Sequence, residues 1–392
     1  MVRRTEDLMR IAIDAVGISR PGGGRSATLP LLEALFEVDR RNDYLVIVDQ
    51  KEPSLEGHGS RVRQMVTPIR HRIAVRAWAQ VVFPVLFRRE AIDVVHFTKN
   101  LGTFFTPGRS VITMYDMTII ACPRFYPWSD VWYWRTVQRL TLRNVDRIIS
   151  ISENTAREMA SYYRLPREKI TVIPCACHSR YRPLDREQVG RVRARYGLPE
   201  KMILHVGSIA PKKNLGTLAE AFAMLVERDD YDGSLVFVGR VYEKGQGDVI
   251  FEQVKRLGLS DRVIFTGSVP DEDLPAIYNA AQFMVFPSVN EGFGIVLLEA
   301  MASGCPIIAS STTAVPEAVG DAGILLSDPR DAGEIRSAML RLLEDEQLRS
   351  ELRARGLRRA ARFSWESIAR ETLRLYEQLG DASATPRARA QS

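Results

Sequence analysis

The sequence predicts an α/β protein made of two doubly wound parallel-sheet domains that face each other across a cleft. Short apolar, β-branched runs alternate with longer amphipathic stretches along the whole chain, which is typical of strand, helix, strand units and a parallel sheet. The alternation forms two sets, separated by a stretch with no strong period. With 392 residues, 45% of them hydrophobic and 26% charged, the chain suits a soluble protein of about two domains.

Each half of the chain contributes one set of predicted strands. In the first half the apolar runs are Arg10 to Val16, Tyr44 to Val48, Val94 to Phe97, Ser110 to Met114 and Arg147 to Ser150. In the second half they are Met202 to Val206, Leu235 to Val238, Val263 to Thr266, Phe283 to Phe286, Pro306 to Ala309 and Gly323 to Leu326. An apolar helix is predicted at Leu29 to Phe36, and the last predicted helix, Trp365 to Tyr376, is amphipathic.

The segment from Pro174 to Pro199 is rich in Arg, Pro and Tyr and has no strong period, so we place the domain junction there. This predicts an N-terminal domain over residues 1–180 and a C-terminal domain over residues 195–364. Gly380 to Ser392 is small, polar and basic and is predicted to be a disordered tail. Open parallel sheets bind ligands at the carboxyl ends of their strands, so a ligand held by both domains would occupy the cleft.

Two features bear on location. Met1 to Leu8 is charged and has no apolar run of the kind found in secretory signals. The longest apolar stretch, Val81 to Phe87, is interrupted by Pro84 and is far shorter than the roughly 20 residues of a membrane-spanning helix. We therefore expect a cytoplasmic protein. The net charge of +6 favours anionic ligands but does not choose among nucleotides, acidic lipid headgroups and nucleic acid.

Candidate metal ligands have simpler explanations. Cys175 and Cys177 lack the two-residue gap and the second pair of a zinc site. The acidic triplets Asp230 to Asp232 and Asp271 to Asp273 have the D-x-D spacing of an element that binds a divalent ion. The first lies in a predicted turn, and the second opens a predicted helix, where capping and the helix dipole favour acids. We expect no metal.

Two adjacent lysines follow the predicted strand that ends at Val206. The sequence from Gly207 to Asn214 contains Lys212 and Lys213, and an amphipathic helix to about Leu225 comes next. Cations at a helix N-terminus are unfavourable by a few tenths of a kcal/mol. A diphosphate about 4 Å from one ammonium gains about 4 kcal/mol at an effective dielectric of 20. The lysines therefore favour an anionic ligand, with a solvated basic loop as the alternative.

Two glutamates eight positions apart frame a double glycine turn. Glu291 precedes Gly292 and Gly294 in a loop, and Glu299 lies inside the apolar helix predicted from Ile295 to Met301, which Gly304 would cap. Carboxylates near a diphosphate must accept hydrogen bonds from neutral hydroxyls, and the vicinal diols of a hexose or ribose supply them. The backbone amides of the turn remain for sugar hydroxyls or phosphate. The alternative is a surface glutamate and a glutamate that merely tops a helix.

A glycine-rich segment from Pro21 to Ala27 follows the first predicted strand and could cradle a phosphate or an acceptor. Gly22, Gly24 and Ala27 imitate a dinucleotide fingerprint, with Asp49 at the place of its ribose-binding acid. That fingerprint requires a tight turn directly after the strand, whereas five further residues intervene here. Nicotinamide binding is therefore disfavoured.

Polar residues also follow two strands of the N-terminal half. Tyr115 and Asp116 are predicted to face the cleft and touch a transferred sugar, with capping of the next turn as the alternative for Asp116. Ser152 is most simply a helix cap, and ligand contact is the minority interpretation. The histidines whose spacing suggests no partner are His96, His178 and His205.

Taken together, these motifs resemble the retaining glycosyltransferases of family 4. The resemblance rests on Val206-Gly207 to Lys213-Asn214, on Phe286-Pro287-Ser288 leading to Glu291-Gly292-Phe293-Gly294, on Glu299 to Gly304, and on Phe363-Ser364-Trp365-Glu366. It spans nearly the whole chain. It implies the GT-B fold, in which two Rossmann-like domains flank a cleft and the last helix, here about residues 365–378, packs back onto the N-terminal domain.

The resemblance also implies roles for single residues. Lys213, with Lys212 where the family often has Arg, would hold the diphosphate of a nucleotide sugar, Glu291 the transferred hexose and Glu299 the ribose. The implied donor-binding residues are Gly24, Gly207, Lys212, Lys213, Gly267, Ser268, Val269, Glu291, Gly292, Phe293, Gly294, Ile295 and Glu299, and the implied catalytic residues are Glu291, Lys213 and Asp116. Transfer would retain the anomeric configuration without a metal or another cofactor.

Three departures from the family pattern concern the N-terminal half and the junction. Tyr115-Asp116 stands where the family commonly has His-Asp, Pro174 to His178 where it often has Pro-Asn-Gly-Val-Asp, and Ser26 follows Arg25 where an aromatic residue is common. The region from Arg70 to Arg89 mixes basic and apolar residues. It suits a membrane surface or a lipid-linked acceptor, and an ordinary core helix with exposed arginines fits equally well.

The sequence therefore predicts a metal-independent, retaining hexosyltransferase at the cytoplasmic face of the membrane or free in the cytoplasm. Its donor would be GDP-mannose or a UDP-hexose and its acceptor a saccharide or a lipid-linked molecule of the cell envelope. No nucleic acid partner is expected. A GT-B sugar-nucleotide epimerase and a non-catalytic nucleotide-sugar binding protein are the alternatives, and a dehydrogenase is disfavoured by the loop after the first strand.

Overall fold

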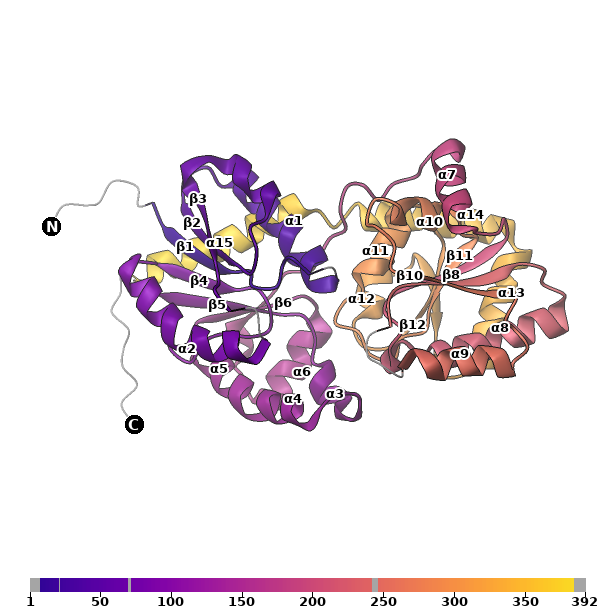
Figure 1. Ribbon diagram of the computed structural model, residues 1–392, viewed down its shortest axis with the longest axis horizontal. Coiled ribbons are helices and arrows are strands. Elements are labelled where there is room, and N and C mark those ends of the chain that lie inside the picture. Colours follow the sequence, from indigo (N-terminus) through magenta and orange to yellow (C-terminus); the bar gives the residue numbers. More distant parts are fainter. Residues whose placement is uncertain (1–7, 21, 70–71, 242–245, 384–392) are drawn as a thin grey trace. The chain divides into compact units, whose positions relative to one another are not determined.

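The computed structural model describes residues 8–20, 22–69, 72–241 and 246–383. The described residues form two compact units (Figure 1). Unit 1 runs to Cys175 and resumes at Ser364, and unit 2 runs from Ala176 to Phe363. Each unit has one parallel sheet with helices on both faces, so the predicted α/β fold with two doubly wound sheets is confirmed.

The described part of unit 1 contains a seven-stranded sheet in the order β3-β2-β1-β4-β5-β6-β7, with every pairing parallel. The strands are β1 (Arg10–Asp14), β2 (Asp43–Val48), β3 (Val62–Val66), β4 (Val94–Phe97), β5 (Arg109–Met114), β6 (Arg147–Ser150) and β7 (Ile170–Val172). The longer helices are α1 (Gly23–Val38), α2 (Arg72–Arg89), α6 (Glu153–Tyr163) and α15 (Trp365–Ser383), and the short ones are α3 (Thr118–Ala121), α4 (Trp128–Tyr133) and α5 (Arg139–Asn144), the last two joined by a π-helical segment over Trp134–Gln138.

The described part of unit 2 contains a six-stranded parallel sheet in the order β10-β9-β8-β11-β12-β13. The strands are β8 (Met202–Val206), β9 (Ser234–Val238), β10 (Val263–Gly267), β11 (Phe283–Phe286), β12 (Ile307–Ser310) and β13 (Gly323–Leu326). The helices are α7 (Arg186–Tyr196), α8 (Leu215–Asp229), α9 (Gln246–Arg256), α10 (Leu274–Ala280), α11 (Ile295–Ala302), α12 (Val315–Val319), α13 (Ala332–Glu344) and α14 (Glu346–Ala360). The central strands are buried on both faces, which explains their continuous apolar runs.

Two strands of unit 1 are absent from the sequence prediction, and both lie at sheet edges. Strand β3 has two adjacent polar residues, Arg63 and Gln64, and only one of its sides pairs with another strand. Strand β7 has three residues, too few for a recognisable pattern. Edge strands are half solvated, so they lack the buried apolar run that identifies a central strand.

Two predicted boundaries are corrected. Helix α1 begins at Gly23 rather than near Leu29, because Arg25 anchors its first turn to the carbonyl oxygen of Ile18 and to Glu52, contacts between segments distant in the sequence. The segment in which we place the junction, Pro174 to Pro199, contains α7, which Asp185 caps by accepting from the Gln188 amide.

The second correction concerns the last helix. Helix α15 continues to Ser383, so Gly380 is helical and packs beside Met9. The remainder of the predicted tail, residues 384–392, lies outside the described residues, as do Pro21, Arg70 and His71. Inside unit 1, α15 packs on α1, and Tyr376 places its hydroxyl 2.6 Å from Nδ1 of His96 on β4.

Candidate functional site

The candidate site lies at the carboxyl ends of β8, β11 and β12 in unit 2. Strand β8 is the point at which the strand order reverses, since β9 and β10 follow on one side and β11, β12 and β13 on the other. Loops leaving neighbouring strands diverge at such a switch point, and open α/β sheets bind their ligands there. The two lysines follow β8, and Glu291 follows β11.

The structure brings the predicted lysines and the first glutamate together. Nζ of Lys213 donates to Oε1 of Glu291 over 2.7 Å, and Nζ of Lys212 lies 4.0 Å from Oε2. Ser288 donates from its hydroxyl to the same Oε1 over 2.9 Å. The Glu291 and Lys213 side chains are each only 10% exposed, so the pair is screened from water.

The electrostatic balance of this cluster favours an anionic ligand. Burial alone would raise the pKa of Glu291, but Lys212 and Lys213 together with the hydrogen bonds from Lys213 and Ser288 lower it to about 2. Glu291 is therefore a carboxylate at neutral pH. Two lysines face this one carboxylate, so positive charge outnumbers negative charge among these three side chains.

A phenylalanine ring and a histidine ring pack near Lys213. Its ammonium lies 4.5 Å from the centroid of the Phe286 ring, in cation–π geometry. His205 on β8 stacks on Phe286. Its Nδ1 donates a hydrogen bond to the carbonyl oxygen of Val285 over 2.9 Å, so Nε2 carries no hydrogen and is an acceptor. Among the described residues Nε2 has no hydrogen-bond partner, and burial lowers the His205 pKa to about 4.

The second glutamate occupies a different environment. Glu299 lies inside α11, is 6% exposed, and accepts a hydrogen bond from the Tyr278 hydroxyl over 2.9 Å. Burial raises its pKa to about 7, although hydrogen bonds from Tyr278 and Tyr181 act in the opposite direction. Loop and helix thus give the two glutamates opposite pKa shifts, one well below and one well above the ordinary value.

The turn between the glutamates has the backbone that its glycines predict. Gly294 has φ 91°, and a Cβ there would lie 2.7 Å from a methyl carbon of Leu297, so the position requires glycine. No side chain caps the α11 N-terminus at this residue. Phe293 is buried and packs edge-on against Phe363, so its side chain belongs to the core. Ile295 begins the helix.

The other predicted donor-binding loop also lies at the carboxyl edge. Gly267 ends β10 with φ 69°, and Ser268 after it is exposed. Gly239, at the end of β9, donates its amide to the Gly267 carbonyl oxygen. A Cβ on Gly239 would lie 1.9 Å from the carbonyl oxygen of Gly207, so this glycine allows neighbouring loops to approach closely.

Several contributors to the site lie outside the sequence prediction. They are His205, Phe286, Ser288, Thr313, Tyr181 and Tyr278. Thr313 accepts the Glu291 amide at Oγ1 over 3.0 Å and has φ 52°, so the loop after β12 fixes the backbone of the glutamate. Serine three residues before a glutamate in a loop is a signal that the sequence contains, whereas the tyrosines come from distant segments and become visible only in the fold.

One aspartate of each acidic triplet forms an ion pair with a basic side chain. Asp273 accepts hydrogen bonds from the Arg195 guanidinium over 2.9 Å and from the Tyr196 hydroxyl over 2.7 Å, and so links α10 to α7. We expected an acid to cap α10, but the Asp273 side chain does not do so. Asp232 accepts both of its hydrogen bonds from Lys201 at 2.8 Å. Within the described ranges, no group of three or more His, Cys, Asp or Glu residues has the geometry for a metal ion.

In unit 1 the carboxyl ends of β1, β2 and β4 gather a charged group. Asp49 accepts from the Gly17 amide over 2.8 Å and from the Ser19 hydroxyl, so it holds the loop after β1 in place. Lys99 after β4 lies beside Gly17 and Gly24, because a Cβ on Gly24 would be 3.5 Å from Cε of that lysine. The predicted ribose-binding acid of a dinucleotide site is therefore a structural residue of this loop.

Tyr115 and Asp116 follow β5 in unit 1. Asp116 accepts the Thr118 amide at Oδ1 over 3.0 Å, which is the capping arrangement of the next turn. Tyr115 is half-buried, with its hydroxyl 3.4 Å from Oγ1 of Thr28 on α1. Ser152 caps α6 by accepting the Thr155 amide over 3.0 Å, as expected. A sugar contact of Asp116 stays a prediction.

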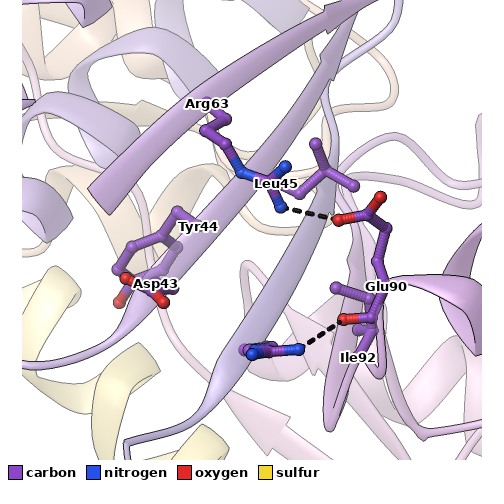
Figure 2. Close-up of a pocket in the computed structure, with 7 residues that line it drawn as sticks. Asp43, Tyr44, Leu45, Arg63, Glu90 and Ile92 are labelled. Carbon is purple, nitrogen blue, oxygen red and sulfur yellow. Dashed lines mark hydrogen bonds and ion pairs between the residues drawn. The ribbon is translucent and has the colours of Figure 1, made fainter. Parts of the chain in front are cut away.

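A pocket of unit 1 lies at the opposite end of its sheet. Figure 2 shows Arg63 of β3 paired with Glu90, at 2.7 Å. The Glu90 carbonyl oxygen also accepts a hydrogen bond from the Arg10 guanidinium over 3.3 Å. The residues lining the pocket are Arg10, Asp43, Tyr44, Leu45, Arg63, Glu90 and Ile92. Arg10 and Asp43 begin β1 and β2, so the pocket sits at the amino ends of the strands, away from the edge where parallel sheets bind ligands.

Comparisons with known proteins agree with the fold. The family model for glycosyl transferases group 1 matches residues 191–359, and that for Glycosyltransferase Family 4 matches residues 21–179. O-antigen chain mannosyltransferase B of Escherichia coli is 34% identical over 292 residues, which cover 74% of this chain and 76% of that protein. MMP alpha-(1->4)-mannosyltransferase of Mycolicibacterium hassiacum is 30% identical over 308 residues, 74% of this chain and 72% of that one.

A solved structure of similar fold is sucrose-phosphate synthase from Thermosynechococcus elongatus, with a TM-score of 0.79 and 24% identity over 95% of this chain and 100% of that one. Its likeness supports the architecture of two Rossmann-like units. The two mannosyltransferases are similar over most of their own length. The lysine and glutamate motifs of unit 2 lie within residues 191–359, which the family model for glycosyl transferases group 1 matches. This chain therefore belongs to glycosyltransferase family 4 and has the GT-B fold.

Proposed function

We propose that the protein is a retaining hexosyltransferase that moves mannose, or a similar hexose, from a nucleotide-diphosphate sugar to a saccharide or lipid-linked acceptor. The product would be a cell-envelope polysaccharide or glycolipid. The observation that carries this proposal is the cluster of Lys212, Lys213 and Glu291 at the switch point of unit 2, which combines two ammonium groups with one carboxylate. The names of the two related mannosyltransferases support the hexose and the role in glycan synthesis.

The donor would be held by a division of roles between cations and carboxylates. Lys213 and Lys212 neutralise the diphosphate, so a divalent ion is not required for this charge. Glu291 accepts hydrogen bonds from the hexose hydroxyls, and Glu299 from the ribose hydroxyls. We expect GDP-mannose as the donor, and a UDP-hexose is the alternative.

Retention would follow from attack on the face of the sugar that the leaving group occupies. The bond between the anomeric carbon and the diphosphate oxygen breaks while the acceptor hydroxyl oxygen bonds to the same face. The acceptor proton passes to the departing phosphate oxygen, so the enzyme needs no separate general base. Lys213 stabilises the charge that develops on the diphosphate.

We place this activity in the cytoplasm or at the cytoplasmic face of the membrane, where nucleotide sugars and the growing glycan would meet. Among the described residues, no helix has the length and apolarity needed to cross a bilayer. Unit 1 would bind the acceptor.

A panel of nucleotide sugars tests the proposal. Purified protein is incubated with GDP-mannose, UDP-glucose and related donors, and nucleotide release and thermal shift are measured with and without a chelator. We expect a thermal shift with one nucleotide family, unchanged by the chelator and largely lost in Lys213→Ala and in Glu299→Ala. Equal binding by the wild type and both variants would exclude this site, and strict dependence on a divalent ion would exclude the metal-independent mechanism.

A further inference from the structure

Unit 1 exposes large apolar side chains that gather on α2, on α4 and α5, and on the loop before β5. The exposed fractions are 80% for Trp128, 56% for Trp132, 70% for Val81, 67% for Val85, 55% for Phe105, 49% for Leu140 and 40% for Phe104. We call these seven residues the apolar face. Two tryptophans this exposed in neighbouring turns of one helix are unusual for a surface that meets only water.

The apolar residues of α2 follow the helical period. Ala77, Val81 and Val85 are exposed at a spacing of four, and Arg88 comes one turn later. Phe83 and Phe87 point the other way and are 1% exposed. The core therefore uses one side of α2, and the opposite side presents an apolar stripe that ends in arginine.

Side-chain contacts join the helices of this region. The Arg76 guanidinium lies 5.5 Å from the centroid of the Tyr133 ring, which links α2 to α4. Gln80 accepts the Phe104 amide over 2.9 Å, and Asn144 at the end of α5 donates to the Phe104 carbonyl oxygen over 3.3 Å. The loop with Phe104 and Phe105 is thus fastened between α2 and α5, which lie along the same side of unit 1 in Figure 1.

The charge of these segments is strongly positive. Helix α2 carries four arginines and no acidic residue, and residues 128–144 carry three arginines and one aspartate. Arg88, Arg89, Arg135 and Arg143 are exposed. Amphipathic surfaces that combine tryptophan and leucine with arginine bind at the interface of anionic bilayers, since the rings enter the headgroup region and the cations meet lipid phosphates.

We propose that the apolar face docks unit 1 onto an anionic lipid surface. A second copy of the chain is the less favourable occupant, because pairing two such faces would oppose their arginines. The docking is peripheral and independent of the identity of the sugar donor. It would bring unit 1 to the layer in which a lipid-linked acceptor lies, so it extends the proposed function without depending on it.

Vesicle flotation tests the proposal with the full chain. Vesicles of equal parts phosphatidylglycerol and phosphatidylcholine are compared with vesicles of phosphatidylcholine alone. We expect binding to the anionic vesicles, a blue shift of tryptophan fluorescence, and weaker binding when ionic strength rises from about 0.1 M to about 1 M, which shortens the Debye length from about 10 Å to about 3 Å.

The variant Trp128→Ser/Trp132→Ser should bind anionic vesicles roughly tenfold more weakly, since it removes two interfacial anchors. Arg135→Gln/Arg143→Gln should reduce the preference for anionic lipid. The matched control is Val249→Ser on α9 of unit 2, because Val249 is 67% exposed, as Val85 is. Nucleotide binding serves as the folding check, since these positions lie outside the donor site.

Absence of binding to anionic vesicles would overturn the proposal, as would equal binding by the wild type and the tryptophan variant. Sedimentation velocity supplies the remaining outcome. A concentration-dependent dimer that the tryptophan variant abolishes would show that a second copy, rather than lipid, covers the apolar face. Loss of donor binding with intact vesicle binding would contradict the proposed function and leave the docking surface standing.

Discussion

The ammonium of Lys213 is bonded to the carboxylate of Glu291 at 2.7 Å in the described structure of unit 2. The lysine expected to hold a diphosphate and the glutamate expected to hold a hexose are therefore partners. A donor that binds here must draw Lys213 partly away from Glu291 and supply hydroxyl donors to the carboxylate in return. The ion pair orders both side chains at the place where opposite parts of the same ligand would lie.

Replacing Lys213 with alanine should weaken the binding of a nucleoside diphosphate. Charge-assisted hydrogen bonds contribute about 1.5–3 kcal/mol, which corresponds to roughly ten- to hundredfold in Kd. Isothermal titration with GDP and UDP measures the effect. Lys201→Ala is the control, since that lysine is 57% exposed and pairs with Asp232. A similar loss in both variants would point to charge at large rather than to Lys213.

Glu291→Gln should separate binding from transfer. Glu291 has a pKa of about 2, so it is a carboxylate at neutral pH and competes with phosphate for the Lys213 ammonium. Removal of this charge leaves the ammonium available to phosphate. We expect the affinity for a nucleoside diphosphate to stay equal or rise. Hexosyl transfer should fall at least about tenfold, because the hexose hydroxyls lose the carboxylate that accepts their hydrogen bonds. A drop in nucleotide affinity matching that of Lys213→Ala would contradict this account of Glu291.

Donor affinity should depend on pH through Glu299. Its pKa of about 7 means that the free protein carries a protonated carboxyl in acid and a carboxylate above neutrality. Because the carboxylate accepts hydrogen bonds from ribose hydroxyls better, nucleotide affinity should rise as pH increases through about 7. Tyr278, Tyr181 and Cys177 face this group, and all three have raised pKa values, so they stay neutral in this window.

The same titration has a defined effect on stability. A glutamate whose folded pKa is raised stabilises the fold below its unfolded pKa, and that contribution is lost as pH rises through about 7. Glu299→Gln should therefore flatten both the stability profile and the affinity profile between about pH 5 and pH 8. Tyr278→Phe should move the midpoint of the affinity profile upward, since it removes a donor to the carboxylate. An unchanged profile in Glu299→Gln would assign the dependence to another group.

Tyr376→Phe should destabilise unit 1. The Tyr376 hydroxyl and Nδ1 of His96 are 2.6 Å apart and buried, and the loss of one partner leaves the other unsatisfied at a cost of about 1–3 kcal/mol. Chemical denaturation followed by circular dichroism measures it. Tyr162→Phe is the control, since Tyr162 is 41% exposed. Equal midpoints for Tyr376→Phe and the wild type would contradict the anchoring of α15.

His96 adds a pH dependence of opposite sign. Burial lowers its pKa to about 3, so the folded protein keeps it neutral while the unfolded chain protonates near pH 6.5. The stability that depends on neutral His96 is complete above about 6.5 and is lost as pH falls toward about 3. His96→Asn should reduce this acid sensitivity in denaturation curves taken at several pH values, whereas an unaltered acid limb would assign it to other groups.

The sequence predicted the central strands and the placement of the two glutamates because their signals are local. A buried parallel strand requires a continuous apolar run, and Gly294 indicates the turn at which α11 begins. The edge strands β3 and β7, the early start of α1 at Gly23 and the length of α15 depend on contacts between distant segments. The sequence did not predict the neighbours of Glu299 for the same reason, because Tyr181 and Tyr278 are distant from it in the sequence and contact it only in the folded chain.

A crystal structure of the protein with GDP-mannose bound tests the central claim most directly. The account predicts the diphosphate within hydrogen-bonding distance of Nζ of Lys213, the mannose hydroxyls on Glu291 and the ribose hydroxyls on Glu299. A donor bound elsewhere, with the Lys213–Glu291 pair intact and Glu299 enclosed by its two tyrosines, would contradict it.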